Sequence, residues 1–80
     1  MKNEIEIKID FEDKITLETI LSAIEVEVVQ SDSDRASVEL NWIETTLIIQ
    51  IIASDFVALR ALTNSIMRLM KTSLEILDIF

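Results

Sequence analysis

The first residues of the chain alternate between apolar and charged side chains. A period of two is typical of a strand that buries one face. Residues 3–11 therefore predict a strand whose charged side faces solvent or a sheet edge, where charge discourages uncontrolled pairing. Its apolar positions are Ile5, Ile7, Ile9 and Phe11, and its charged positions are Glu4, Glu6, Lys8 and Asp10.

The next segment has a helical period. Glu12 and Asp13 stand where a helix start favours acidic side chains. The apolar residues that follow recur at the spacing of one helical face, and they are Leu17, Ile20, Leu21 and Ile24. This pattern predicts a helix over residues 13–25. The period is lost after residue 25, and residues 31–34 predict a polar loop.

Two further strands follow. Residues 35–42 alternate again, with Ala36, Val38, Leu40 and Trp42 on the apolar side. A turn near Glu44 and Thr45 leads to residues 46–53, which are apolar on both faces except at Gln50. A strand of this kind is expected at the centre of a sheet or against a second molecule.

The last segment predicts a long helix over residues 55–79, with Ser54 or Asp55 as its N-cap. Its apolar arc covers roughly half the circumference, which is wider than one core requires. Such a helix can pack on its own sheet and against a further helix. A polar stripe runs opposite and contains Arg60, Asn64, Arg68, Lys71 and Glu75.

The elements follow in the order β-α-β-β-α. This order predicts an α+β fold in which a three-stranded antiparallel sheet carries two helices on one face. We expect residues 1–80 to form a single domain without internal repeats.

The composition points to a protein that binds other proteins. Half of the 80 residues are apolar and the mean hydropathy is +0.39. A domain this small buries only roughly 60% of its unfolded surface. The chain has no Cys and no His, so neither disulfides nor a zinc site can supplement the core. We expect the surplus apolar surface to be covered by a partner.

The net charge of −8 argues against a nucleic-acid-binding module acting alone, which would present a basic surface. Basic residues equal acidic ones in number only in the segment after residue 54. Contact with an anion would therefore use the basic residues of this segment, which are Arg60, Arg68 and Lys71. No apolar run reaches the ~20 residues of a membrane span. We also find no signal-peptide pattern and expect a cytoplasmic protein without membrane contact.

Catalytic chemistry is not supported by the sequence. Without Cys or His the common catalytic pairs cannot form, and without Gly there is no phosphate-binding loop. A weak calcium-loop pattern at residues 32–34 fails because Ser37 and Ile43 stand where Gly and Glu are required. We therefore expect no catalytic residues, no metal and no cofactor.

Residues 53–68 resemble the Pcc family, the small dimerising subunit of the KEOPS complex. The family pattern is an acidic cap followed by Leu-Arg-Ala, Asn-Ser and a basic residue. It is matched by Asp55, Ala58, Leu59, Arg60, Ala61, Asn64, Ser65 and Arg68. Residues 35–40 resemble the second strand of the family. The turn at residues 43–46 lacks the glycine that is common in the family, and residues 26–34 lack its proline.

The resemblance implies a non-catalytic scaffold and dimerisation subunit. KEOPS makes threonylcarbamoyladenosine in tRNA, using a separate metal-containing catalytic subunit that the small subunit binds through its helices. The implied helix contacts are Leu17, Ile20, Leu21, Ile24, Phe56, Leu59, Arg60, Asn64, Ser65, Met67 and Arg68. The implied dimer interface on the strands is Val38, Leu40, Trp42, Ile48, Gln50 and Ile52.

Two alternatives stay open at this stage. The chain could be a diverged paralogue that forms heterodimers or regulates the complex. Its small partner is then a paralogous subunit, whereas for the scaffold subunit it is a second copy of the chain. The chain could also be an accessory module for nucleic acid. For the scaffold subunit, we expect contact with tRNA only within the assembled complex.

Overall fold

The computed structural model describes residues 2–31 and 35–79. The strand β1 (Asn3–Asp10) is followed by the helix α1 (Lys14–Ser31), the strands β2 (Ala36–Ile43) and β3 (Thr46–Ala53), and the helix α2 (Phe56–Ile79). The predicted order β-α-β-β-α is therefore confirmed. Of the predicted loop at residues 31–34, Ser31 ends α1, and the other three positions lie outside the described residues.

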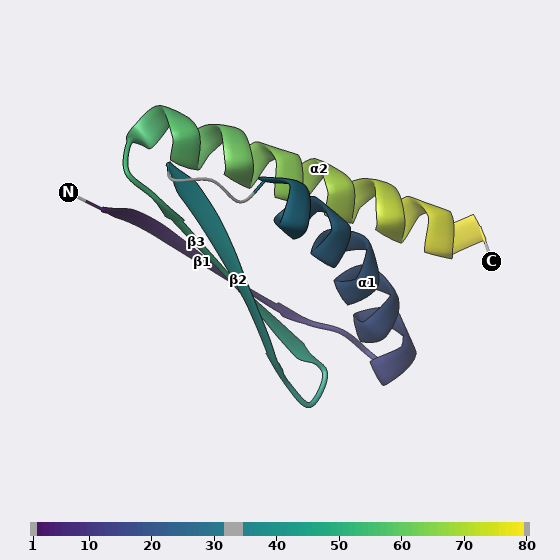
Figure 1. Cartoon of the computed structure of the whole chain (residues 1–80). Helices are drawn as coiled ribbons and strands as arrows, with labels where there is room; N and C mark the ends of the chain where they lie inside the picture. The colour runs from purple at the N-terminus through teal and green to yellow at the C-terminus, as the bar shows by residue number, and fades with distance from the viewer. Residues whose placement is uncertain (1, 32–34, 80) are drawn as a thin grey trace.

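The strands form one antiparallel sheet in the order β1-β3-β2. The strand that is apolar on both faces, β3, lies in the centre, and the charged strand β1 lies at an edge. Both helices cover the same side of the sheet, as Figure 1 shows. The predicted fold class is thus confirmed.

The core lies between the sheet and the two helices. On β3 every second residue is buried, beginning with Leu47 and ending with Ala53, because these side chains point towards the helices. The largest fully buried side chains are Leu17, Ile20, Ile24, Leu47, Ile49, Ile51 and Ile66. Among the described residues no polar or charged side chain is buried. The core is therefore entirely apolar.

Helix α1 is longer than predicted. We expected its end at residue 25, but it continues to Ser31. Val28 continues the apolar face of Leu17, Leu21 and Ile24 and packs against the core cluster. Tertiary packing therefore outweighs the low helix propensity of the valines in this segment.

The turn between β2 and β3 forms without glycine. Glu44 takes a positive φ of 56°, in the left-handed region that is rare for residues with a Cβ. Figure 1 shows this turn at the end of the sheet away from α2. Nearby Trp42 is 53% exposed, although it pairs with the fully buried Leu47 and so shares its face of the sheet.

Candidate protein-binding surfaces

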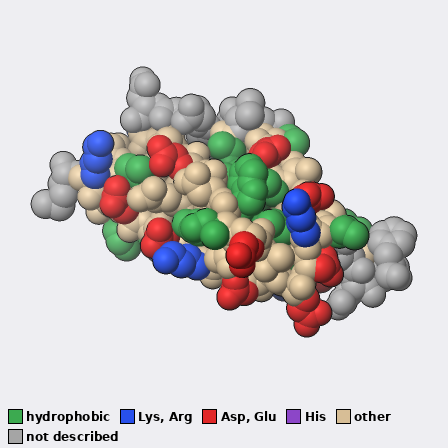
Figure 2. Space-filling model, turned by 90° about the horizontal axis from the view of Figure 1, so that it is seen from below, with side chains coloured by type: hydrophobic (Ala, Val, Ile, Leu, Met, Phe, Trp, Pro, Cys, Tyr) green, Lys and Arg blue, Asp and Glu red, His purple; other side chains and the backbone are tan. Residues whose placement is uncertain are grey.

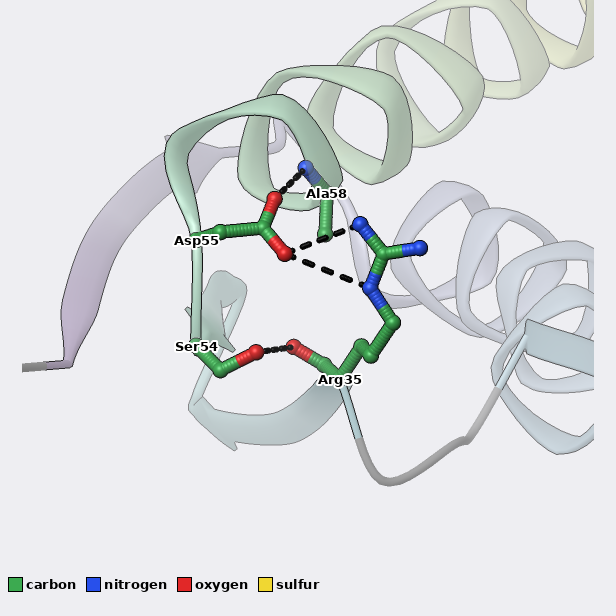
Figure 3. A network of polar contacts seen from close by, with 4 residues as sticks. All are labelled: Arg35, Ser54, Asp55 and Ala58. Atoms are coloured by element: carbon green, nitrogen blue, oxygen red, sulfur yellow. Dashed lines mark hydrogen bonds and ion pairs between the residues drawn. The ribbon is translucent and has the colours of Figure 1, made fainter.

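The start of α2 is tied to the start of β2 by a small polar network (Figure 3). The backbone N–H of Ala58 donates to Oδ1 of Asp55 at 2.7 Å, so Asp55 is the N-cap of α2. The Arg35 guanidinium donates to Oδ2 of the same carboxylate, from Nη2 at 2.8 Å and from Nε at 3.2 Å. The backbone N–H of Ser54 donates to the Arg35 carbonyl oxygen at 2.8 Å. Of the two N-cap candidates in the sequence, the structure selects Asp55.

Helix α1 is capped in the same way. The backbone N–H of Thr16 donates to Oδ1 of Asp13 at 2.7 Å, and this bond, followed by the one from the Thr16 hydroxyl, lowers the pKa of Asp13 below its ordinary value of 3.8. For Asp55 the bond from the Ala58 N–H, followed by the one from Arg35, lowers the pKa below 3.8 as well. Both carboxylates are therefore stabilised in the ionised form by the helix starts.

We expect these two caps to make the stability of the domain fall in acid. A carboxyl whose pKa is lower in the folded chain stabilises the fold above its unfolded pKa, and this contribution is lost as the pH falls through the folded value. Urea unfolding between about pH 6 and pH 2 should show a decline below pH 4. In the double variant Asp13→Asn, Asp55→Asn, which retains a capping oxygen, the decline should be shallower. An unchanged slope in the variant would show that other carboxyls govern the acid response.

The helix residues predicted to meet a partner differ in how far they are exposed. Five of them are buried in the core of this chain, at 8% exposure or less, and are Leu17, Ile20, Leu21, Ile24 and Leu59. Their contacts are made within the domain. Ser65 is half-buried, whereas the remaining five lie exposed on α2 and are Phe56, Arg60, Asn64, Met67 and Arg68.

The exposed side of α2 combines apolar and basic side chains. We call this the helix surface, and it consists of Phe56, Arg60, Asn64, Met67, Arg68 and Lys71. Phe56 is 70% exposed and Met67 is 48% exposed. The two lie on one edge of the helix, about three turns apart. Large exposed apolar side chains beside cations are typical of protein interfaces, where aromatic residues, Met and Arg are enriched.

A shallow groove lies on each side of α2. The one towards β1 has a volume of about 300 Å³ and is lined by Ile5, Phe56, Leu59, Arg60, Thr63 and Asn64. The other has a volume of about 330 Å³ and is lined by Arg35, Ala36, Val57, Ala58, Ala61, Leu62 and Ser65. Asn64 lines the first groove and Ser65 lines the second. The Asn-Ser pair of the sequence motif therefore contributes one residue to each side of α2.

The strand residues predicted to form a dimer interface lie on opposite faces of the sheet. Val38 and Leu40 pair with the buried Ile51 and Ile49 and face the helices, as Trp42 does. Ile48, Gln50 and Ile52 alternate with the buried residues of β3 and lie on the side that no helix covers. Because successive side chains of a strand point to opposite faces, the six residues cannot form one continuous sheet face.

We call the uncovered side the open sheet face. Pairing of the three strands places twelve residues on it, namely Glu4, Glu6, Lys8, Asp10, Ser37, Glu39, Asn41, Ile43, Thr46, Ile48, Gln50 and Ile52. The Thr46 hydroxyl donates to the Asp10 carboxylate across β1 and β3. Seen from below the view of Figure 1, hydrophobic side chains gather between acidic and basic ones (Figure 2).

Some exposed apolar residues were missed by the sequence analysis. Val57 is 73% exposed and Ile43 is 66% exposed. On α1, Ile15 is 75% exposed and Val26 is 60% exposed, so this helix also presents apolar surface. Placing α1 on a helical wheel would have separated Ile15 and Val26 from the buried face, since both lie away from Leu17 and Ile20.

Two other kinds of site are not found within the part of the chain that the structure describes. Across residues 2–31 and 35–79, no three acidic side chains come together in a way that could hold a metal ion. Nor does either described helix have the length and apolar character that crossing a membrane requires. The exposed apolar surfaces of the two helices and of the sheet are the candidate binding sites.

These features define a two-layer α+β domain, with two capped helices on one face of a three-stranded sheet and apolar residues exposed on both layers. The sequence matches the family described as "Transcription factor Pcc1" over residues 4–78, and the chain belongs to this family. The resemblance seen in residues 53–68 is thereby confirmed.

The fold is similar to that of a chain in the crystal structure of the binary complex Gon7-Pcc1. The TM-score is 0.72 with 23% sequence identity, over 96% of this chain and 94% of that chain. At this identity the likeness shows a shared fold. No curated protein matches the sequence.

Proposed function

We propose that this chain is a non-catalytic scaffold subunit of a KEOPS complex. In this role it binds the catalytic threonylcarbamoyl transferase subunit through its helices and supports the modification of tRNA. Membership of the Pcc1 family supports the proposal, and the complex named Gon7-Pcc1 is one in which a protein of similar fold binds another subunit. The observation that carries it is the helix surface, where Phe56 and Met67 stand exposed beside Arg60 and Arg68.

The charge distribution favours a protein partner over nucleic acid. The family description speaks of a transcription factor, but a chain with net charge −8 repels the phosphate backbone over most of its surface. The exposed cations of α2 are Arg60, Arg68 and Lys71. They form one stripe, which suits contact with tRNA only when other subunits of the complex provide the rest of the binding surface.

Co-elution tests the proposed function directly. The purified chain is mixed with the catalytic KEOPS subunit of the same organism and analysed by size exclusion with light scattering. We expect a stable complex whose mass is the sum of the subunits. Separate elution of the two proteins at concentrations of tens of micromolar would refute the scaffold role.

Asn64 is expected to contribute to this binding without stabilising the domain. It is exposed in mid-helix, where Asn is a poorer helix former than Ala. Asn64→Ala should leave the melting temperature unchanged or slightly higher. It should weaken binding of the catalytic subunit about 2- to 10-fold, the effect of one lost hydrogen bond.

The matched control for this experiment is Asn41→Ala. Asn41 is also exposed but lies on the open sheet face, and its loss should not affect the helix surface. Isothermal titration calorimetry measures both variants. Equal affinities of Asn64→Ala and the unmodified chain would exclude Asn64 from the interface.

A further inference from the structure

Burial on β2 falls towards the turn that joins it to β3. Val38 is 9% exposed, Leu40 is half-buried and Trp42 is 53% exposed, although all three lie on the side of the sheet that the helices cover. Trp42 pairs with Leu47, which is fully buried. The helices therefore cover the central strand at this end of the sheet and leave about half of the Trp42 side chain in solvent.

The turn that follows Trp42 lies against the connection between β1 and α1. The backbone N–H of Phe11 donates to the Thr45 carbonyl oxygen at 2.9 Å. Figure 1 shows α1 beginning at this end of the molecule, whereas α2 begins at the opposite end of the sheet. We call the surface formed by Phe11, Glu12, Trp42 and Glu44 the hairpin end. It is separate from the helix surface.

The hairpin end is acidic. Three carboxylates of the two connections, those of Glu12, Asp13 and Glu44, stand against one lysine, Lys14, which is a formal net charge of −2. Asp13 already accepts the backbone N–H of Thr16 at the start of α1. Glu12 and Glu44 are exposed on either side of the contact between the two connections. These two glutamates are therefore placed to meet a cationic partner.

Glu44 holds a carboxylate where the backbone favours glycine. Its φ of 56° lies in the left-handed region, which glycine adopts without the steric cost that a Cβ brings. Across the described residues 2–31 and 35–79, it is the one residue with a positive φ. Residues held in this conformation cluster at sites of ligand contact. Gly or Asn would suit the turn better, so the carboxylate is best explained by a role outside the fold.

We propose that the hairpin end binds a basic segment of another protein, in which Arg or Lys lies next to an apolar side chain. A cation of the segment stacks on the exposed part of the Trp42 indole, and Glu12 and Glu44 pair with further cations. Trp is the aromatic residue that attracts cations most strongly, and it is among the residues that dominate interface energies.

A second copy of the chain does not complement the hairpin end. In a two-fold dimer the same surface meets itself, so Glu12 and Glu44 of one copy would face the same acids of the other. Like charges in this position oppose association. The partner is therefore a different chain, and its interface is additional to that of the proposed function because it does not use the helix surface.

The fluorescence of Trp42 tests the charge of the site. The chain has one Trp and no Tyr, so tryptophan emission comes from this indole alone. Quenching by caesium and by iodide is measured at low ionic strength, each relative to free N-acetyltryptophanamide. Nearby acids concentrate the cation and repel the anion, so the relative constant for caesium should be at least about twice that for iodide. In Glu12→Gln, Glu44→Gln this ratio should fall towards one. The matched control Glu4→Gln, Glu75→Gln removes two exposed acids from the start of β1 and the last turns of α2 and should retain it.

A labelled peptide tests recognition. The probe is fluorescein-labelled Arg-Leu-Arg-Leu-Arg, measured by fluorescence anisotropy at low salt. Its counterpart Arg-Ser-Arg-Ser-Arg has the same charge without the apolar side chains. We expect the leucine peptide to bind at least about fivefold more tightly than the serine peptide. Trp42→Leu keeps an apolar residue but removes the indole, and it should weaken binding of the leucine peptide about three- to tenfold. Circular dichroism checks that this variant remains folded.

Glu44→Gly separates binding from stability. Its melting temperature should be unchanged or higher, because glycine adopts the positive φ freely. Its affinity for the leucine peptide should nevertheless fall about two- to fivefold, the effect of one exposed ion pair. A residue with a purely structural role would not give these opposite changes.

Three results would overturn the proposed interface. One is equal relative quenching by caesium and iodide in the unmodified chain. Another is a leucine peptide that binds no more tightly than the serine peptide, or that neither Trp42→Leu nor Glu44→Gly weakens. The third is self-association of the unmodified chain that shields Trp42 from acrylamide, since a second copy would then cover the hairpin end. Binding of the catalytic subunit is measured separately and uses the helix surface, so failure here is distinguishable from failure of the proposed function.

Discussion

Replacing Ile66 with alanine is expected to lower the free energy of unfolding by about 2–5 kcal/mol. Ile66 is fully buried in the apolar layer between α2, α1 and the sheet. An 80-residue domain has a total stability of roughly 4–12 kcal/mol, so the variant should lose a large part of it. Denaturant titration followed by far-UV circular dichroism measures the change.

Met67 provides the matched control on the same helix. It follows Ile66 directly but is 48% exposed, so Met67→Ala should change the free energy of unfolding by less than about 0.5 kcal/mol. If both variants lose stability equally, α2 does not pack through the face that the structure assigns. Comparison of the two variants also separates effects on folding from effects on binding, since Met67 belongs to the helix surface and Ile66 does not.

The double variant Phe56→Ser, Met67→Ser is expected to weaken binding of the catalytic KEOPS subunit by at least about 2 kcal/mol, roughly 30-fold. The two side chains are the large exposed apolar residues of the helix surface, and aromatic residues that fill a partner's pocket dominate interface energies. The domain itself should remain folded, since neither residue belongs to the buried core. Isothermal titration calorimetry measures the affinity, and circular dichroism the fold.

Ile43→Ser is the control for this loss of apolar surface. Ile43 is 66% exposed but is the last residue of β2. The turn that follows it lies at the end of the sheet away from α2 (Figure 1). We expect the substitution to leave the affinity unchanged. Equal effects of Ile43→Ser and the double variant would show that the catalytic subunit docks elsewhere, and full affinity of the double variant would contradict the helix surface as its binding site.

Most elements of the fold could be predicted from the sequence because their apolar residues recur with a clear period. The alternation of Ile5, Ile7 and Ile9 with charges predicted a strand whose charged side faces solvent or a sheet edge, and β1 is an edge strand. The apolar residues on both faces of residues 46–53 predicted a strand at the centre of a sheet or against a second molecule, and β3 lies between β1 and β2. The predicted span of this strand agrees with the structure, Thr46–Ala53. The spacing of apolar residues and the polarity of each side chain are local properties, so a single sequence is enough to determine them.

The candidate site was less accessible, because it depends on which positions are left uncovered. Leu21 and Phe56 are both apolar residues at helical positions, yet the first is 8% exposed and the second 70% exposed. Val38 and Ile52 were grouped as one interface, but they lie on opposite faces of the sheet. A hydrophobic pattern ranks residues by their tendency to leave water, and it does not say whether this chain or another one covers them.

The residue pattern alone was sufficient for the order β-α-β-β-α, the apolar face of α1 and the surplus of apolar residues over what a small domain can bury. Three-dimensional packing was needed to extend α1 through Val28, to choose Asp55 as the cap of α2 and to bring Glu6 and Glu39 into one row across Gln50. The physical reason is that the periodic spacing of apolar residues depends on neighbours in the sequence. Burial, and the alignment of charged side chains across strands, depend on segments far apart in the sequence that meet only in the folded chain.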